Sequence, residues 1–223
     1  MKKLMLVICL LSMGSLCWAR SAPPLGSAQS FAVMGASTVT NAGPTVITGD
    51  LGVSPGTAVT GFPPGKVSGG TIHAGDATAT AAQAAAHTAY ANLVAQSCGT
   101  NLPGKTLGTS PGAVTLSPGV YCFNTSAQLT GTLTLNGSGV YVFKMGTTLT
   151  TASNSSVVLA KGATAGNVFW QVGSSATLGT NSALEGSILA NISDTVTTGT
   201  SVTGRVFALT GAVTLASARV ARA

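Results

Sequence analysis

One short unit recurs along this chain of 223 residues and constrains its fold more than any other feature. Its clearest copy is GRVFALTGAVTL at residues 204–215, and related copies begin at Gly119, Gly139 and Gly166. Each copy contains an apolar strand, a break at Gly or Ser, and a second strand in which Thr alternates with Leu or Val. Such a unit cannot bury its apolar face alone, so its repetition is typical of a solenoid of stacked coils. The copies are unevenly spaced, so we expect an irregular solenoid.

Two other stretches extend this interpretation. The sequence VTNAGPTVITG, which begins at Val39, resembles VTTGTSVTG at residues 196–204, so we expect the two ends of the chain to stack together. Residues 76–96 are Ala-rich and free of Gly and Pro, and Asp76 stands where a helix N-cap would be. We predict a single long helix at about residues 76–96, lying along the solenoid. Its predicted packing face contains Ala79, Ala82, Ala86, Ala89 and Leu93.

The first 19 residues are typical of a secretory signal peptide. Lys2 and Lys3 precede an apolar stretch at residues 4–16, and Ala19 ends a plausible cleavage site. No later apolar run is long enough to cross a bilayer. We therefore predict cleavage near Ala19 and a single domain at residues 20–223, located outside the cell or in the periplasm and not in a membrane.

Charge is scarce in this sequence. Only 6% of the residues are charged, against roughly 25% in ordinary soluble proteins. The formal net charge is +6, and loss of two lysines with the signal peptide leaves 6 − 2 = +4. The basic residues are scattered singly, which argues against nucleic-acid binding. The acidic residues are too few and dispersed to indicate a metal site, so we expect no cofactor, and nothing in the sequence demands more than a monomer.

Two cysteines, Cys98 and Cys122, remain after removal of the signal peptide. In an oxidising compartment such a pair indicates a disulfide. A redox or metal site is the alternative, but the pair lacks CxxC spacing and has no neighbouring histidine. We predict a structural bridge between Cys98 and Cys122.

Several motifs together closely resemble the ice-binding (antifreeze) protein family of bacteria and fungi. Among them are TVTNAGPTVITGDLGVSPG, GTIHAGDA, GVYVFKMGTTLTTASNSSVVL and TVTTGTSVTGRVFALTGAVTL, and the resemblance covers nearly all of residues 31–215. It implies a mainly β fold: an irregular, right-handed parallel β-helix of roughly triangular cross-section with one long α-helix packed alongside. It also implies that the partner is the surface of an ice crystal, bound by one flat face rich in Thr, Ser, Ala and Gly, giving thermal hysteresis and inhibition of ice recrystallisation.

The family's T-A/G-x-T/N motif selects candidate residues for that face. Residues 151–154, TASN, fit it; residues 198–201, TGTS, fit except for the last position; residues 180–183, TNSA, depart twice. Strand parity separates this column from the rank of Thr148, Thr150, Thr195 and Thr197. We favour the column of Thr151 and Thr198 and keep the other rank as the alternative. The residues predicted to contact ice are Asn41, Thr60, Thr130, Thr132, Thr150, Thr151, Ala152, Asn154, Thr180, Ser182, Thr198, Gly199, Thr200 and Ser201.

Threonine suits such a face for physical reasons. Coils of a parallel solenoid stack about 4.8 Å apart, and alternate residues of a strand lie about 6.6 Å apart, which gives a regular grid. Threonine is β-branched, so its methyl and hydroxyl groups point in predictable directions. Threonine is also a common strand former, and threonine ladders occur in solenoids that bind no ice.

Two alternatives remain from the sequence. Residues 52–56, GVSPG, match the G-x-S-x-G pattern of a hydrolase, but Pro55 lacks the N–H that would help form an oxyanion hole. We therefore expect a turn there, no catalytic residues, and no enzyme activity. A secreted adhesin or a carbohydrate-binding or carbohydrate-active β-helix is the other alternative, although the few aromatic residues mostly occupy apolar strand positions.

Overall fold

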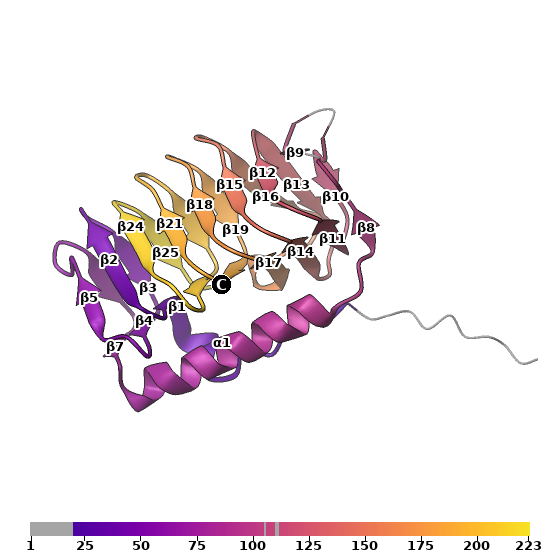
Figure 1. The fold of residues 1–223 in the computed structure, drawn as a ribbon. Helices are drawn as coiled ribbons and strands as arrows, with labels where there is room; N and C mark the ends of the chain where they lie inside the picture. Colours follow the sequence, from indigo (N-terminus) through magenta and orange to yellow (C-terminus); the bar gives the residue numbers. More distant parts are fainter. Residues whose placement is uncertain (1–19, 105, 110–111) are drawn as a thin grey trace, which may run out of the picture.

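The structure, a computed structural model, describes residues 20–104, 106–109 and 112–223. The predicted signal peptide, residues 1–19, lies outside the described residues. The prediction of a β-solenoid is confirmed: the chain winds through three parallel sheets, which we call A, B and C, and one long helix accompanies them (Figure 1). No helix among the described residues is long and apolar enough to span a bilayer.

Each sheet contains one strand from each of several stacked coils. The spatial order of these strands differs from their order along the chain. Sheet A comprises β7 (Ile72–Ala74), β4 (Asp50–Val53), β1 (Phe31–Gly35), β23 (Val206–Ala208), β20 (Ser187–Ala190), β17 (Val168–Val172), β14 (Tyr141–Met145), β11 (Gly119–Phe123) and β8 (Thr100–Asn101). Sheet B comprises β5 (Ala58–Thr60), β2 (Thr38–Ala42), β24 (Val213–Ala216), β21 (Asp194–Val196), β18 (Ala176–Leu178), β15 (Leu149–Thr151), β12 (Ala127–Leu129) and β9 (Thr106–Leu107). Sheet C comprises β10 (Thr115–Leu116), β13 (Thr132–Asn136), β16 (Ser156–Ala160), β19 (Ala183–Glu185), β22 (Ser201–Thr203), β25 (Arg219–Ala221), β3 (Val46–Thr48) and β6 (Lys66–Ser68).

The two ends of the chain stack against each other, as the similarity between residues 39–49 and 196–204 predicts. Strands β1, β2 and β3 of the N-terminal coil pair with β23, β24 and β25 of the last coil. The helix α1 (Ala77–Ala95) then carries the chain back along the stack to β8, where the remaining coils begin (Figure 1). Two short 3₁₀ helices, η1 (Gly26–Ser30) and η2 (Ala165–Asn167), precede β1 and β17.

Helix α1 covers the outer surface of sheet A. Its first turn is capped by Asp76, whose Oδ1 accepts the backbone N–H of Ala79 at 2.7 Å. The five residues of its predicted packing face are all fully buried. Four of them, all but Ala79, form a second core with outward-facing apolar residues of sheet A, such as Phe31, Phe169 and Phe207. The central strands of sheet A, such as β1 and β17, are therefore buried on both faces, which explains their continuous apolar sequences.

Apolar side chains from all three sheets fill the interior of the solenoid. Three aromatic rings stack along its axis: the Tyr121 and Phe143 centroids are 5.5 Å apart, and those of Phe143 and Trp170 are 4.1 Å apart. The Trp170 indole donates to the carbonyl of Glu185 at 2.9 Å. The larger aromatic residues thus belong to the core, as the sequence indicates, rather than to a sugar-binding platform.

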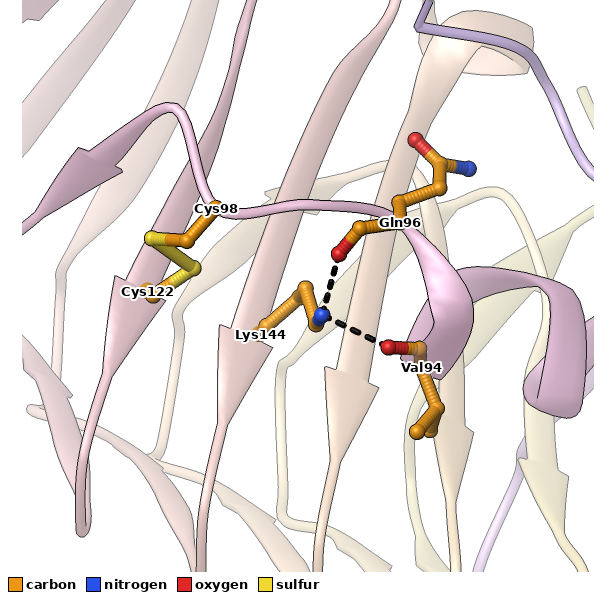
Figure 2. Close-up of a disulfide and its surroundings, with 5 residues drawn as sticks. All are labelled: Val94, Gln96, Cys98, Cys122 and Lys144. Carbon is orange, nitrogen blue, oxygen red and sulfur yellow. Dashed lines mark hydrogen bonds between the residues drawn. A yellow bond between two sulfur atoms is a disulfide. The ribbon is translucent and has the colours of Figure 1, made fainter. Parts of the chain in front are cut away.

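A disulfide links the segment that follows α1 to strand β11. Figure 2 shows the predicted disulfide between Cys98, just after α1, and Cys122 on β11. Beside it, the Lys144 ammonium on β14 donates to the Val94 carbonyl at 2.7 Å and to the Gln96 carbonyl (Figure 2). A cation at this position satisfies two carbonyls at the helix C-terminus.

Candidate functional site

Helix α1 covers the outer face of sheet A but not the outer faces of sheets B and C. The outer face of sheet C carries the charged residues Lys66, Arg219 and Glu185. Sheet B is different: the charged residue within its strands, Asp194, points inward and is 1% exposed. Burial raises the pKa of the Asp194 carboxyl well above its usual range. The outer face of sheet B is therefore an extended surface whose described strands present no charge.

A single rank of outward-facing residues runs the length of sheet B. Each member occupies the middle or an end of its strand next to inward-facing residues, most of them Val, Leu or Ala, and the strand pairing aligns the members coil by coil. In spatial order they are Thr60, Thr40, Thr214, Thr195, Thr177, Thr150, Gln128 and Thr106. We call this row the threonine ladder.

Small residues flank the threonine ladder on both sides. The column two residues earlier contains Ala58, Thr38, Ala212, Ser193, Ser175, Thr148 and Ser126. Backbone N–H groups of the following coil donate to two of these hydroxyls, from Ser193 to Ser175 at 3.3 Å and from Ala212 to Ser193 at 3.2 Å. On the other side, the hydroxyl of Thr197 donates to the carbonyl of Leu178 at 2.7 Å. Hydrogen bonds between coils thus hold several flanking side chains in place.

The outer face of sheet B is preorganised, and from Thr60 to Thr150 its central row is made of threonine alone. Coils about 4.8 Å apart and flanking columns about 6.6 Å away repeat hydroxyl and methyl groups in two directions. Each ladder threonine has a restricted χ1, so little side-chain freedom is lost on contact with a rigid surface. Such an array can order water or contact a crystalline solid.

The comparisons with known proteins identify the family. Residues 33–221 match the ice-binding-like family. The chain belongs to this family. It is 51% identical over 211 residues to an ice-binding protein of Nostoc sp. (strain HG1), covering 92% of this chain and 76% of that one. Among solved structures, an ice-binding protein of the Antarctic ascomycete Antarctomyces psychrotrophicus is 43% identical with a TM-score of 0.82, covering 90% of this chain and 98% of that one. One from an Arctic yeast, LeIBP, is 30% identical with a TM-score of 0.79, covering 91% and 94%.

Four residues that the sequence assigned to the ice-binding face are turned inward. Thr151 pairs with Leu129 and Leu178, which places it in the core-facing column of sheet B, and it is 2% exposed. Its hydroxyl donates to Ser182 at 3.2 Å and accepts the N–H of Gly179 at 2.8 Å. The prediction that these side chains contact ice is therefore wrong. The four residues are Thr151, Ser182 and Thr200, which are buried, and Asn41, which is half-buried and pairs with Leu215 of the inward column.

Thr200 and Asn41 have equally local roles. The hydroxyl of Thr200, which is 1% exposed, donates to the carbonyl of Gly179 at 3.0 Å. The Asn41 amide donates to the carbonyls of Gly43 and Gly61, each at 2.8 Å. Polar side chains at these positions satisfy backbone groups where the chain leaves sheet B for sheet C.

The three stretches compared with the T-A/G-x-T/N pattern all lie at the corner between sheets B and C. Asn154, Asn181 and Gly199 occupy successive coils there with φ of 60°, 57° and 74°. Asn and Gly tolerate this left-handed conformation better than other residues do. The first Thr of TASN caps the corner from inside, and the Asn makes the turn. Asn181 and Gly199, however, are the second residues of TNSA and TGTS, so the three stretches share this corner in different registers.

The other predicted residues fall into three groups. Thr60 and Thr150 belong to the threonine ladder. Thr132 and Ser201 begin strands of sheet C and point outward from that sheet. The remaining residues lie along the corner between sheets B and C at the edge of the ladder face, exposed or half-buried: Thr130, Ala152, Asn154, Thr180, Thr198 and Gly199.

From the sequence, the rank of Thr148, Thr150, Thr195 and Thr197 was only the alternative candidate, yet this rank lies on the face that carries the threonine ladder. Thr148 and Thr195, from that alternative, lie on the outer face of sheet B, as does Thr150. The ladder members absent from the predicted list are Thr40, Thr106, Thr177, Thr195 and Thr214, besides Gln128. A signal for them is present in VTL, ATL and DTV, where a central Thr is flanked by residues of the inward column.

The hydrolase alternative gains no support from its residues. Ser54 is 4% exposed, and its hydroxyl lies 3.0 Å from that of Thr80 on α1. His73 Nδ1 lies 2.7 Å from the Asp76 carboxylate, which caps α1. The backbone N–H of Ala79 and the His73 ring hold the pKa of Asp76 below its usual value. Among the described residues, no group of three or more His, Cys, Asp or Glu side chains is placed to hold a metal.

Proposed function

We propose that this protein adsorbs to ice crystals through the outer face of sheet B, and thereby produces thermal hysteresis and inhibits ice recrystallisation. The observation that carries the proposal is the threonine ladder, flanked by small residues on a face whose strands present no charge. Membership of the ice-binding-like family supports the same ligand. A solved relative, LeIBP from Arctic yeast, is described in terms of antifreeze activity.

The proposed mechanism depends on many weak contacts formed together. Ladder methyl groups fit against the crystal, while hydroxyls hydrogen-bond to water at its surface. A charged side chain would keep its own hydration shell, and its absence lets the ordered water on the face merge with the lattice. Since the coils are stacked and hydrogen-bonded, the face is in place before ice arrives, and adsorption orders few groups.

We further propose that the protein acts outside the cell, or in the periplasm, as a non-catalytic monomer. Removal of residues 1–19 would leave residues 20–223 as one ice-binding domain. The export prediction rests on the charged and apolar pattern of the first 19 residues. N-terminal sequencing of the exported protein tests it, and a mature chain that begins far from Arg20 contradicts it.

Thr177→Tyr tests the face directly. Thr177 lies in the middle of the ladder and is exposed, so a phenol ring there projects above the plane and separates neighbouring rungs from ice. We expect most of the thermal hysteresis to be lost while circular dichroism and melting temperature stay near wild type, because an exposed substitution costs about 0.5 kcal/mol or less.

Thr203→Tyr is the matched control, since Thr203 is an exposed threonine in the middle coils of sheet C. We expect it to keep full hysteresis and full partitioning into ice. A folded Thr177→Tyr variant with undiminished activity would overturn the assignment to sheet B. Glycan pull-down of the wild-type protein, with no partitioning into ice, would favour a carbohydrate-binding protein instead.

A further inference from the structure

One rung of the threonine ladder differs from all the others. Gln128, on β12, aligns with Thr150 on one side and Thr106 on the other. The preceding six rungs, from Thr60 to Thr150, are threonines without interruption. Gln128 therefore separates the last ladder threonine from the rest.

Glutamine is poorly suited to a rigid contact surface. Its side chain extends beyond the γ position where threonine ends, and it rotates about more bonds. Gln128 is exposed and forms no hydrogen bond to another described residue that would fix it. Holding such a side chain in one rotamer costs about 1–2 kcal/mol, whereas threonine loses little freedom. In its extended form the amide also stands above the plane of the methyl groups.

The surface around this rung is also hollowed. A shallow depression of about 300 Å³ lies over β9, β12 and β15, and its lining is mostly polar: Gly104, Thr106, Thr125, Ser126, Ala127, Gln128, Thr148 and Thr150. Thus a protruding side chain and a depression occur together at one end of the ladder. A flat crystal surface cannot follow both.

We infer that Gln128 limits the ice-contacting area, confining the regular array to the six rungs from Thr60 to Thr150 and keeping Thr106 from contributing. This inference rests on the proposed function and concerns the extent of the same face. Replacement of one exposed side chain, Gln128→Thr, then joins the two segments into eight contiguous threonines (6 + 1 + 1). The natural protein would hold an activity below what its fold allows.

The test is a gain of activity in Gln128→Thr. We expect thermal hysteresis at equal concentration to rise by about a third or more, in line with eight contiguous rungs in place of six, because adsorption sums contacts from a preorganised array. The reciprocal variant, Thr177→Gln, leaves a longest run of four rungs and should reduce hysteresis to about two thirds or less. Circular dichroism and melting temperature check that both variants fold.

Val158→Thr is the matched control. It also introduces a β-branched hydroxyl at an exposed strand position, but on sheet C, and should leave hysteresis unchanged. If Gln128→Thr folds and shows no gain, the inference is overturned; it is equally overturned if Thr177→Gln keeps full activity. These results are distinguishable from failure of the proposed face, because Thr177→Tyr should then still lose most of its thermal hysteresis.

Discussion

The hydroxyl of Thr40 donates to that of Thr214 across 3.4 Å, although 174 residues separate the two in the chain. Thr40 lies on the N-terminal coil and Thr214 on the last coil, so the threonine ladder passes directly across the junction of the two ends. The ladder is therefore complete only when the N-terminal coils stack on the C-terminal ones. Stability at this junction and the extent of the proposed ice-binding face are therefore linked.

Ile47→Ala tests the strength of that junction. Ile47 is fully buried and pairs with Val220 of the last coil, so truncation leaves a cavity at the contact between the two ends. We expect a loss of about 2–5 kcal/mol in unfolding free energy, measured by chemical denaturation. Val46→Ala, on the same strand with its side chain turned outward, should change stability by about 0.5 kcal/mol or less. Equal effects of the two substitutions would contradict this account of the junction.

Thr150 and Thr151 are neighbours with opposite predicted roles. Thr151→Val removes the hydroxyl that joins Ser182 and the N–H of Gly179 inside the corner, and should cost about 1–2 kcal/mol of stability while hysteresis is retained. Thr150→Val removes an exposed ladder hydroxyl and should lower hysteresis with little change in stability. Denaturation curves and hysteresis measured on both variants separate the roles. An activity loss confined to Thr151→Val would return Thr151 to the ice-binding face.

The disulfide should stabilise the end of the stack that contains β8 and β11, and it should have little effect on ice binding. The bridge closes a chain segment with a sequence separation of 24 residues between Cys98 and Cys122. In the loop-entropy model such a link contributes about 3 kcal/mol. The double variant Cys98→Ser, Cys122→Ser should unfold at lower denaturant concentration and retain hysteresis near 0 °C. Mass spectrometry of the wild-type protein checks the bridge; two free thiols after export contradict it.

The fold was predictable from the sequence because its signals are local and repeated. The alternating pattern predicts the strands, and the Ala-rich segment after Asp76 predicts the helix. The similarity between the two chain ends predicts that they stack together. The predicted helix differs from α1 only in its capping residues, Asp76 and Gln96.

The proposed ice-binding face was harder to predict, because the direction of a side chain depends on strand parity across a corner that the sequence does not reveal. Thr150 and Thr151 are adjacent and chemically identical, yet one is exposed and the other is buried. A shift of one residue exchanges the two faces of a strand. The TASN motif added to the error, because a turn that needs Asn154 at positive φ and a buried Thr has the same composition as an exposed polar face.

The final prediction concerns Asp194, on β21 of sheet B. Its side chain is turned into the core, where both carboxylate oxygens lack a hydrogen-bond partner among the described residues. The aligned residue on the neighbouring strand is Ala176, so alanine fits this column. Burial of a polar group without a partner costs about 1–3 kcal/mol, and Asp194→Ala should therefore raise the free energy of unfolding at pH 7 by a similar amount.

The stability gained by Asp194→Ala should depend on pH, and the raised pKa of Asp194 sets the direction of that dependence. Burial raises the pKa of the Asp194 carboxyl in the folded state, so the folded protein binds a proton that the unfolded chain has released. The stability associated with the protonated form is present below the unfolded pKa, near 4, and is lost as pH rises through the higher folded value. The advantage of Asp194→Ala over wild type should therefore be smallest near pH 4 and grow toward neutral pH. Denaturation of both proteins across this range measures it, and an advantage that stays constant or shrinks with rising pH would show that the carboxylate has a partner.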